Sequence, residues 1–162
     1  MRGILFRSRV AGVALAALTM VGTGCEALIV QRVGEARTGA GLPQLPQSTY
    51  LKDVAWALVV EHCLASDGGP IEPIDPMQYY IHEPAIAMVH LEEKARIDPD
   101  LDPDIQNVAA TNEIWARWQD DPAITDPRWD DMAVVEFPCV IPDGNGYAVA
   151  DLYMALVLRD RP

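Results

Sequence analysis

The sequence predicts an α+β fold, in which two or three helices pack on a small antiparallel sheet that ends in a C-terminal hairpin. The clearest strand is Tyr147–Leu158, where apolar residues alternate with Tyr147, Asp151 and Tyr153. The clearest helix follows Asp102, because apolar residues then recur at the spacing of one helical face: Ile105, Val108, Ala109, Trp115 and Ala116. A hairpin alone is only marginally stable in water. We therefore expect the helices to cover one face of the sheet.

The segment before residue 50 has the composition of a tether. Large apolar residues thin out after Val33, and residues 25–49 contain breakers of regular structure: Gly34, Gly39, Gly41, Pro43 and Pro46. This pattern predicts a single globular domain at 50–162, a length that can bury a core of its own.

Two further elements are expected between residues 50 and 96. Tyr50–Ala65 suits a buried strand or a helix, and we favour the helix because Ser48 or Thr49 can cap it. Pro84 lies where a helix accepts proline, in its first turn. A helix is therefore predicted from Pro84 to Arg96, with Glu92 and Arg96 paired one turn apart.

The second half of the chain supplies the remaining elements. Asp102 and Pro103 are typical of a helix start, and Glu113 and Arg117 can pair on its outer side. Met132–Ile141 is predicted as a strand, and the turn Pro142–Gly146 connects it to the last strand.

The N-terminus is built like a bacterial export signal. Arg2, Arg7 and Arg9 precede an apolar run of 12 residues, Val10–Val21, and small residues follow. A basic start, a short apolar run and small residues before a cut are the three parts of a secretory signal.

Thr23 and Gly24 lead directly to Cys25. This region, residues 1–25, resembles the signal and lipobox of bacterial lipoprotein precursors, although Gly22 stands where that family usually has leucine. The resemblance implies that the Cys25 thiol carries a diacylglycerol, that residues 1–24 are removed as a signal peptide, and that the membrane is a partner. It also implies a protein facing the periplasm or the cell surface. In that family an aspartate after the cysteine usually marks retention in the inner membrane, so Glu26 slightly favours a location in the outer membrane. Two alternatives stay open: a cleaved soluble protein, and an uncleaved anchor spanning Val10–Val30.

The cysteine count agrees with this resemblance. The chain has three cysteines, and lipid on Cys25 would leave Cys63 and Cys139 as a pair. Disulfides persist outside the cytoplasm, so we expect a Cys63–Cys139 bond. The alternative is two buried free thiols.

The charge of the chain excludes one class of partner. The net charge is −12, and removal of residues 1–24, which hold three basic and no acidic residues, makes it −15. Nucleic-acid binding relies on basic residues that neutralise phosphates, so we expect no nucleic-acid partner. Basic protein surfaces are the expected attractors.

A carbohydrate site is the alternative function. Trp118 and Trp129 flank an acidic loop, and a sugar site uses an aromatic ring for stacking and carboxylates for hydroxyl groups. The residues that would form it are Trp118, Asp120, Asp121, Trp129, Asp130 and Asp131. Two such carboxylates can also cleave a glycosidic bond.

Cofactor and enzyme signatures are sparse. Alternating aspartates, Asp98, Asp100, Asp102 and Asp104, resemble the start of a calcium loop, but prolines stand between them where a glycine is usual. His62, His82 and His90 lack the spacing of metal ligands, and the sequence contains no nucleophile elbow or phosphate loop. The sequence thus predicts a non-enzymatic binding or structural module, with calcium as the single candidate cofactor.

Overall fold

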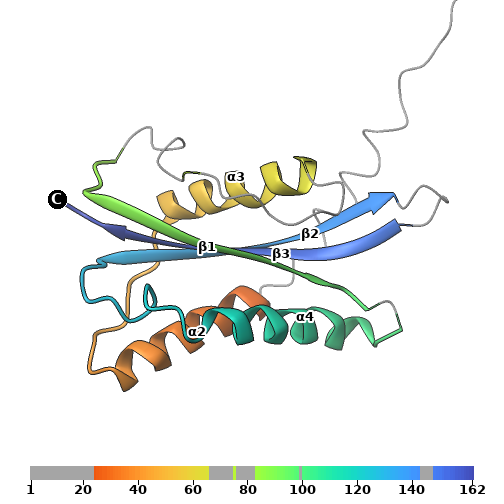
Figure 1. Ribbon diagram of the computed structural model, residues 1–162, viewed down its shortest axis with the longest axis horizontal. Helices are drawn as coiled ribbons and strands as arrows, with labels where there is room; N and C mark the ends of the chain where they lie inside the picture. Colours follow the sequence, from red (N-terminus) through yellow and green to blue (C-terminus); the bar gives the residue numbers. More distant parts are fainter. Residues whose placement is uncertain (1–23, 66–74, 76–82, 99, 143–147) are drawn as a thin grey trace, which may run out of the picture.

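The computed structural model describes residues 24–65, 75, 83–98, 100–142 and 148–162, and these form three layers (Figure 1). The elements are α2 (Gly24–Gly39), α3 (Thr49–Ala65), β1 (Ala87–Arg96), α4 (Pro103–Trp118), β2 (Asp131–Pro142) and β3 (Ala148–Asp160). The α+β class with a C-terminal strand pair is confirmed.

The three strands form one antiparallel sheet in the order β1-β3-β2. β3 pairs with β2 from Ala148 to Arg159 and with β1 from Asp151 to Asp160. It is therefore the central strand, and every residue from Asp151 to Arg159 is buried. Alternate residues point to opposite faces of a sheet, so both faces of β3 need a cover.

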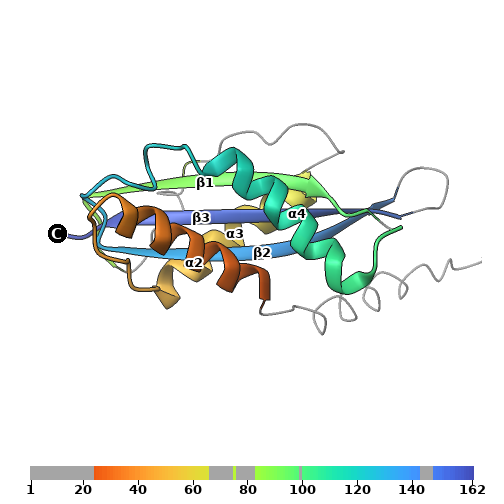
Figure 2. The same cartoon turned by 90° about the horizontal axis from the view of Figure 1, so that it is seen from below.

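Helices cover both faces, which corrects the expectation of one covered face. α3 lies on one side of the sheet, and α2 and α4 lie on the other (Figures 1 and 2). The core is correspondingly divided. Leu152, Met154, Leu156 and Leu158 join the cluster on the side of α2 and α4, and Tyr153, Ala155 and Val157 join the cluster beneath α3. Tyr153, Ala155 and Val157 form a second apolar face, and α3 buries it.

The helix favoured for Tyr50–Ala65 is confirmed, with bounds Thr49–Ala65. Ser48 caps it, since its hydroxyl accepts a hydrogen bond from the Leu51 amide at 3.3 Å. Cys63 near the end of α3 is bonded to Cys139 of β2. The expected disulfide is thus confirmed, and it ties the helix to an edge strand of the sheet.

The helix predicted for Pro84–Arg96 is wrong, because Ala87–Arg96 forms strand β1. Its residues alternate between the two core clusters, with Val89 and Leu91 packed toward α4 and Met88 packed toward α3. Glu92 contacts histidines instead of Arg96. The pairing of Glu113 with Arg117 on α4 is confirmed.

The tether predicted for residues 25–49 is also wrong, because Gly24–Gly39 forms α2 and Ile29 and Val33 are fully buried in the core. The chain then turns at Gly41, whose φ of 77° favours glycine. Beyond it the Pro46 carbonyl accepts a hydrogen bond from the Met132 amide at 3.0 Å, along the outer edge of β2. The compact domain therefore includes residues that composition had assigned to a spacer.

Arg37 fixes the last turn of α2. Its side chain is fully buried and donates hydrogen bonds of 3.0 Å each to the carbonyl oxygens of Pro43, Ile124 and Asp126. Three carbonyl groups from two loops thereby depend on one guanidinium. Burial lowers the pKa of Arg37, and the three acceptors compensate for the lost hydration.

We predict that Arg37→Met lowers the free energy of unfolding by about 3 kcal/mol, because three buried carbonyls lose their donor. Arg32→Met on the same helix is the matched control. Arg32 contacts Asn112 and the Trp115 ring near the surface, so its loss should cost about 1 kcal/mol or less. Urea denaturation followed by circular dichroism measures both. Equal decreases in the free energy of unfolding for the two variants would contradict the role of Arg37 in fixing the last turn of α2.

Candidate functional site at Cys25

Cys25 lies in the first turn of α2, at the junction between the N-terminal segment and the domain. Its relative exposure is 5 %, and it is the free cysteine of the described residues. The thiol faces Thr111 of α4 and Glu136 of β2, which both influence its pKa. Burial raises its pKa, so in this position the thiol is a poor nucleophile.

Glu136 is the unusual partner in this site. Its side chain faces α2 and α4 among apolar neighbours because Met132 and Val134, which precede it at even spacing on β2, point the same way. Its exposure is 3 %, and its Oε2 has no hydrogen-bond partner among the described residues. Desolvation raises the pKa of Glu136 to about 7, the Cys25 hydrogen bond opposes that rise, and the charge of Glu26 adds to it.

Glu26, next to Cys25, connects the site to the far layer. Its carboxylate pairs with Lys52 of α3 at 2.8 Å. The start of α2 is thus held by contacts to three elements: Thr111 on α4, Glu136 on β2 and Lys52 on α3. The polar residue on β2 could have been found in the sequence, because Glu136 interrupts the apolar face of a predicted strand.

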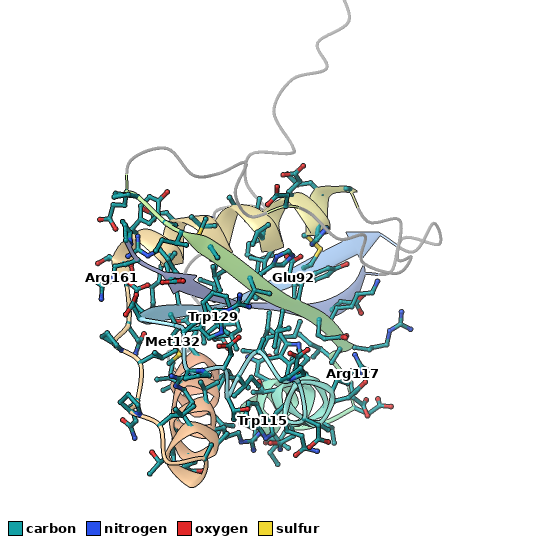
Figure 3. The ribbon with its side chains drawn as sticks, turned by 60° about the vertical axis from the view of Figure 1, so that its left-hand side comes forward. Glu92, Trp115, Arg117, Trp129, Met132 and Arg161 are labelled. Atoms are coloured by element: carbon teal, nitrogen blue, oxygen red, sulfur yellow. A yellow bond between two sulfur atoms is a disulfide. The ribbon has the colours of Figure 1, made fainter. Side chains whose placement is uncertain are left out.

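The proposed carbohydrate site is not formed. Trp118 and Trp129 are each 3 % exposed and belong to the core on the side of α2 and α4, and Figure 3 shows Trp129 between the sheet and the helices. The Trp129 indole donates to the Ala123 carbonyl at 2.9 Å. The ring faces are therefore not available for stacking on a sugar. Burial of both indoles depends on tertiary packing that the local sequence does not reveal.

Three of the four acidic residues of that hypothesis have structural partners. Asp131 is buried and pairs with Arg159, and Asp130 accepts a hydrogen bond from the Arg161 amide. Asp121 accepts one from the Ala123 amide in a turn, and Asp120 is exposed. The six residues consequently do not converge on one surface.

The alternating aspartates also shape the chain locally. Asp98 accepts a hydrogen bond from the Asp100 amide, and the Asp102 carbonyl accepts the first amides of α4. The side chain of Asp104 lies outside the described residues. Within the described part of the chain, no group of three or more histidine, cysteine or acidic residues is placed to hold a metal ion.

Another polar cluster, which was not predicted from the sequence, lies on the α3 side of β1. Glu92, labelled in Figure 3, bridges two imidazoles: its Oε1 is 3.0 Å from Nδ1 of His62 and its Oε2 is 3.1 Å from Nε2 of His90. Lys94 and Arg96 continue this face, each 3.7 Å from Asp151. His62 could have been identified from the sequence, because it continues the buried stripe Leu51, Val54, Leu58 of α3 at helical spacing.

Comparisons with known proteins extend the description of the fold. No family model matches the chain, and no curated protein is significantly similar in sequence. An outer surface protein of Borrelia burgdorferi has a similar structure, with a TM-score of 0.52 and 13 % identity over 86 % of this chain and 95 % of that one. The likeness is one of fold.

A cysteine-rich secretory protein of Staphylococcus aureus subsp. aureus Mu50 is similar to the same degree. Its TM-score is 0.51 and its identity 11 %, over 88 % of this chain and 40 % of that protein. The present chain thus corresponds to less than half of the staphylococcal protein. Within the described residues, no helix is long and apolar enough to cross a membrane.

We predict that Glu136 makes the stability of the unlipidated chain depend on pH. Its pKa is near 7 in the folded state and near 4.5 when unfolded, so folding favours the protonated acid. The contribution of Glu136 to stability is then highest below pH 4.5 and falls by about 3 kcal/mol as the pH rises from 4.5 to about 7. Glu136→Gln should remove that fall.

The control is Glu35→Gln, at an exposed position of α2. Chemical denaturation at pH 5 and pH 8 compares the variants. The burial of a desolvated acid would be contradicted if the wild-type protein were more stable at pH 8 than at pH 5 and Glu136→Gln abolished that difference.

Proposed function

We propose that the protein is an exported lipoprotein of the bacterial envelope, fixed to the membrane by a diacylglycerol on Cys25. In this proposal residues 1–24 are the removed signal, and the domain acts as a binding or structural module outside the cytoplasm. The observation that carries it is the pairing of Cys63 with Cys139. That pairing leaves Cys25, at the end of the signal-like segment, as the remaining thiol.

Two further observations support an extracytoplasmic address. Disulfides that close long stretches of chain persist in oxidising compartments, and this one joins residues 76 positions apart. Two solved structures of similar fold are described as an outer surface protein and a secretory protein. Their identity to this chain is low, so they add to the proposal only through the shared fold.

The buried position of Cys25 sets a condition on this proposal. A diacylglycerol does not fit between Thr111 and Glu136, where the thiol is 5 % exposed. The lipid must therefore be attached before α2 packs, while the chain is still extended at the membrane. The proposal thus requires the side chain of residue 25 to turn away from Glu136 in the lipidated protein.

The charge of the domain indicates the kind of partner. Its surplus of acidic groups favours a basic protein surface over nucleic acid. A role as a binding module needs no further chemistry from the chain.

The mass of the mature protein recovered from membranes tests the proposal. We expect a chain that begins at Cys25, carries lipid and lacks the two hydrogens of the disulfide. Cys25→Ser should remove the lipid and the membrane recovery. The double variant Cys63→Ser, Cys139→Ser is the control, and its lipid should be retained because those thiols are remote from the signal.

Two masses would contradict the proposal. A chain that begins at Cys25 with a free thiol would indicate a soluble exported protein, and an intact chain from Met1 would indicate an uncleaved anchor.

A further inference from the structure

The described surface holds an apolar stripe at the start of α4 that the fold does not use. Leu101, Ile105 and Val108 are 37 %, 54 % and 42 % exposed. Ile105 and Val108, three residues apart, lie on one side of α4, and Leu101 lies two residues before its start. The sequence pattern had assigned Ile105 and Val108 to the core. The buried side of α4 instead carries Ala110, Ile114 and Trp118, so this α4 stripe faces solvent.

The α4 stripe continues the side of α4 that α2 covers. Further along that side, Asn112 and Trp115 contact Arg32 of α2. Thr111, one turn beyond Val108, contacts Cys25. α2 begins at Gly24, beside the N-terminal half of α4 (Figure 2). The α4 stripe therefore lies next to the point where the chain enters the domain.

The entry point has no spacer. Cys25 precedes the fully buried Ile29 by four residues of helix, a rise of about 6 Å. A lipid on Cys25 would consequently hold the surface around the start of α2 directly at the bilayer. In the mature protein the chain would end there, so residues 1–24 would not be present to cover the α4 stripe.

We propose that the α4 stripe is a membrane-contact surface that rests on the bilayer into which the Cys25 lipid inserts. This inference rests on the proposed function. Apolar side chains beside a lipid anchor add a second membrane contact.

The neighbouring charges select the lipid headgroup. Asp98, Asp100 and Asp102 flank Leu101 and are exposed, and the mature domain has a net charge of −15. Anionic headgroups repel this surface within a Debye length. The α4 stripe accordingly contacts zwitterionic headgroups such as phosphatidylcholine or phosphatidylethanolamine.

A fluorescent reporter at Ile105 tests the contact. Ile105→Cys in the lipidated protein is labelled with an environment-sensitive dye and reconstituted into phosphatidylcholine vesicles that contain nitroxide-labelled lipid. Ile86→Cys is the matched control, because Ile86 is also an exposed isoleucine, at 65 %. It precedes β1, whereas α4 follows the other end of that strand (Figure 1).

We expect blue-shifted emission at position 105 and quenching several-fold stronger than at position 86. Replacing a third of the phosphatidylcholine with phosphatidylglycerol should reduce the quenching at 105. Val108→Cys provides a second reporter if the label at 105 impairs folding. Equal quenching at positions 105 and 86 would overturn the inference, and so would a blue shift at 105 that accompanies chain–chain crosslinking without quenching.

The mass of each labelled protein distinguishes failure of the proposed function from failure of the membrane-contact surface. Protein without lipid on Cys25 would show that the proposed function fails. Lipidated protein in which the reporters at 105 and 108 are not quenched would show that the membrane-contact surface alone fails.

Discussion

The structure depends on one constraint, the burial of β3 on both of its faces. Leu152, Met154, Leu156 and Leu158 point to one side, and Tyr153, Ala155 and Val157 point to the other. A strand of this composition is stable only between two apolar layers. α3 provides one layer, and α2 and α4 together provide the second (Figure 1). α2 is thereby drawn into the domain, and with it the residue that ends the signal-like segment.

The same packing explains the buried polar groups on α2 and its neighbours. Arg37 binds the loops that follow α2 and α4 through three carbonyl oxygens. Glu136 lies at the opposite end of α2, where it meets Cys25 and leaves one oxygen without a partner among the described residues. The buried polar group at the C-terminal end of α2, Arg37, thus has its hydrogen bonds formed, whereas the N-terminal end lies against a desolvated acid.

The sequence contained enough information for the elements with strong local signals. Alternation predicted β3, the cap at Asp102 predicted the start of α4, and the count of cysteines predicted the Cys63–Cys139 bond once Cys25 was set aside. β1 was missed because Pro84 and the pair Glu92, Arg96 are equally compatible with a helix. Its pairing with β3 involves residues about 60 positions away, a distance at which local patterns give no information.

The candidate site was predicted only in part. Cys25 was identified from its position after small residues, but its contacts with Thr111 and Glu136 arise from three separate elements. α2 was mistaken for a tether because of its glycines, and Gly34 has a packing reason, since a Cβ there would lie 3.1 Å from the Gln44 side chain. Trp118 and Trp129 were assigned to a ligand because their neighbours are acidic. In the structure both side chains are instead buried in the core on the side of α2 and α4.

Because α2 belongs to the folded domain, Cys25 has no spacer. Amide hydrogen exchange of the mature protein, resolved along residues 25–49, tests it most directly. We expect protection from Ile29 to Arg37 that approaches that of the central strand β3, because both are lost together on global unfolding. Exchange across this segment at the rate of an unstructured peptide would contradict it and restore the tether.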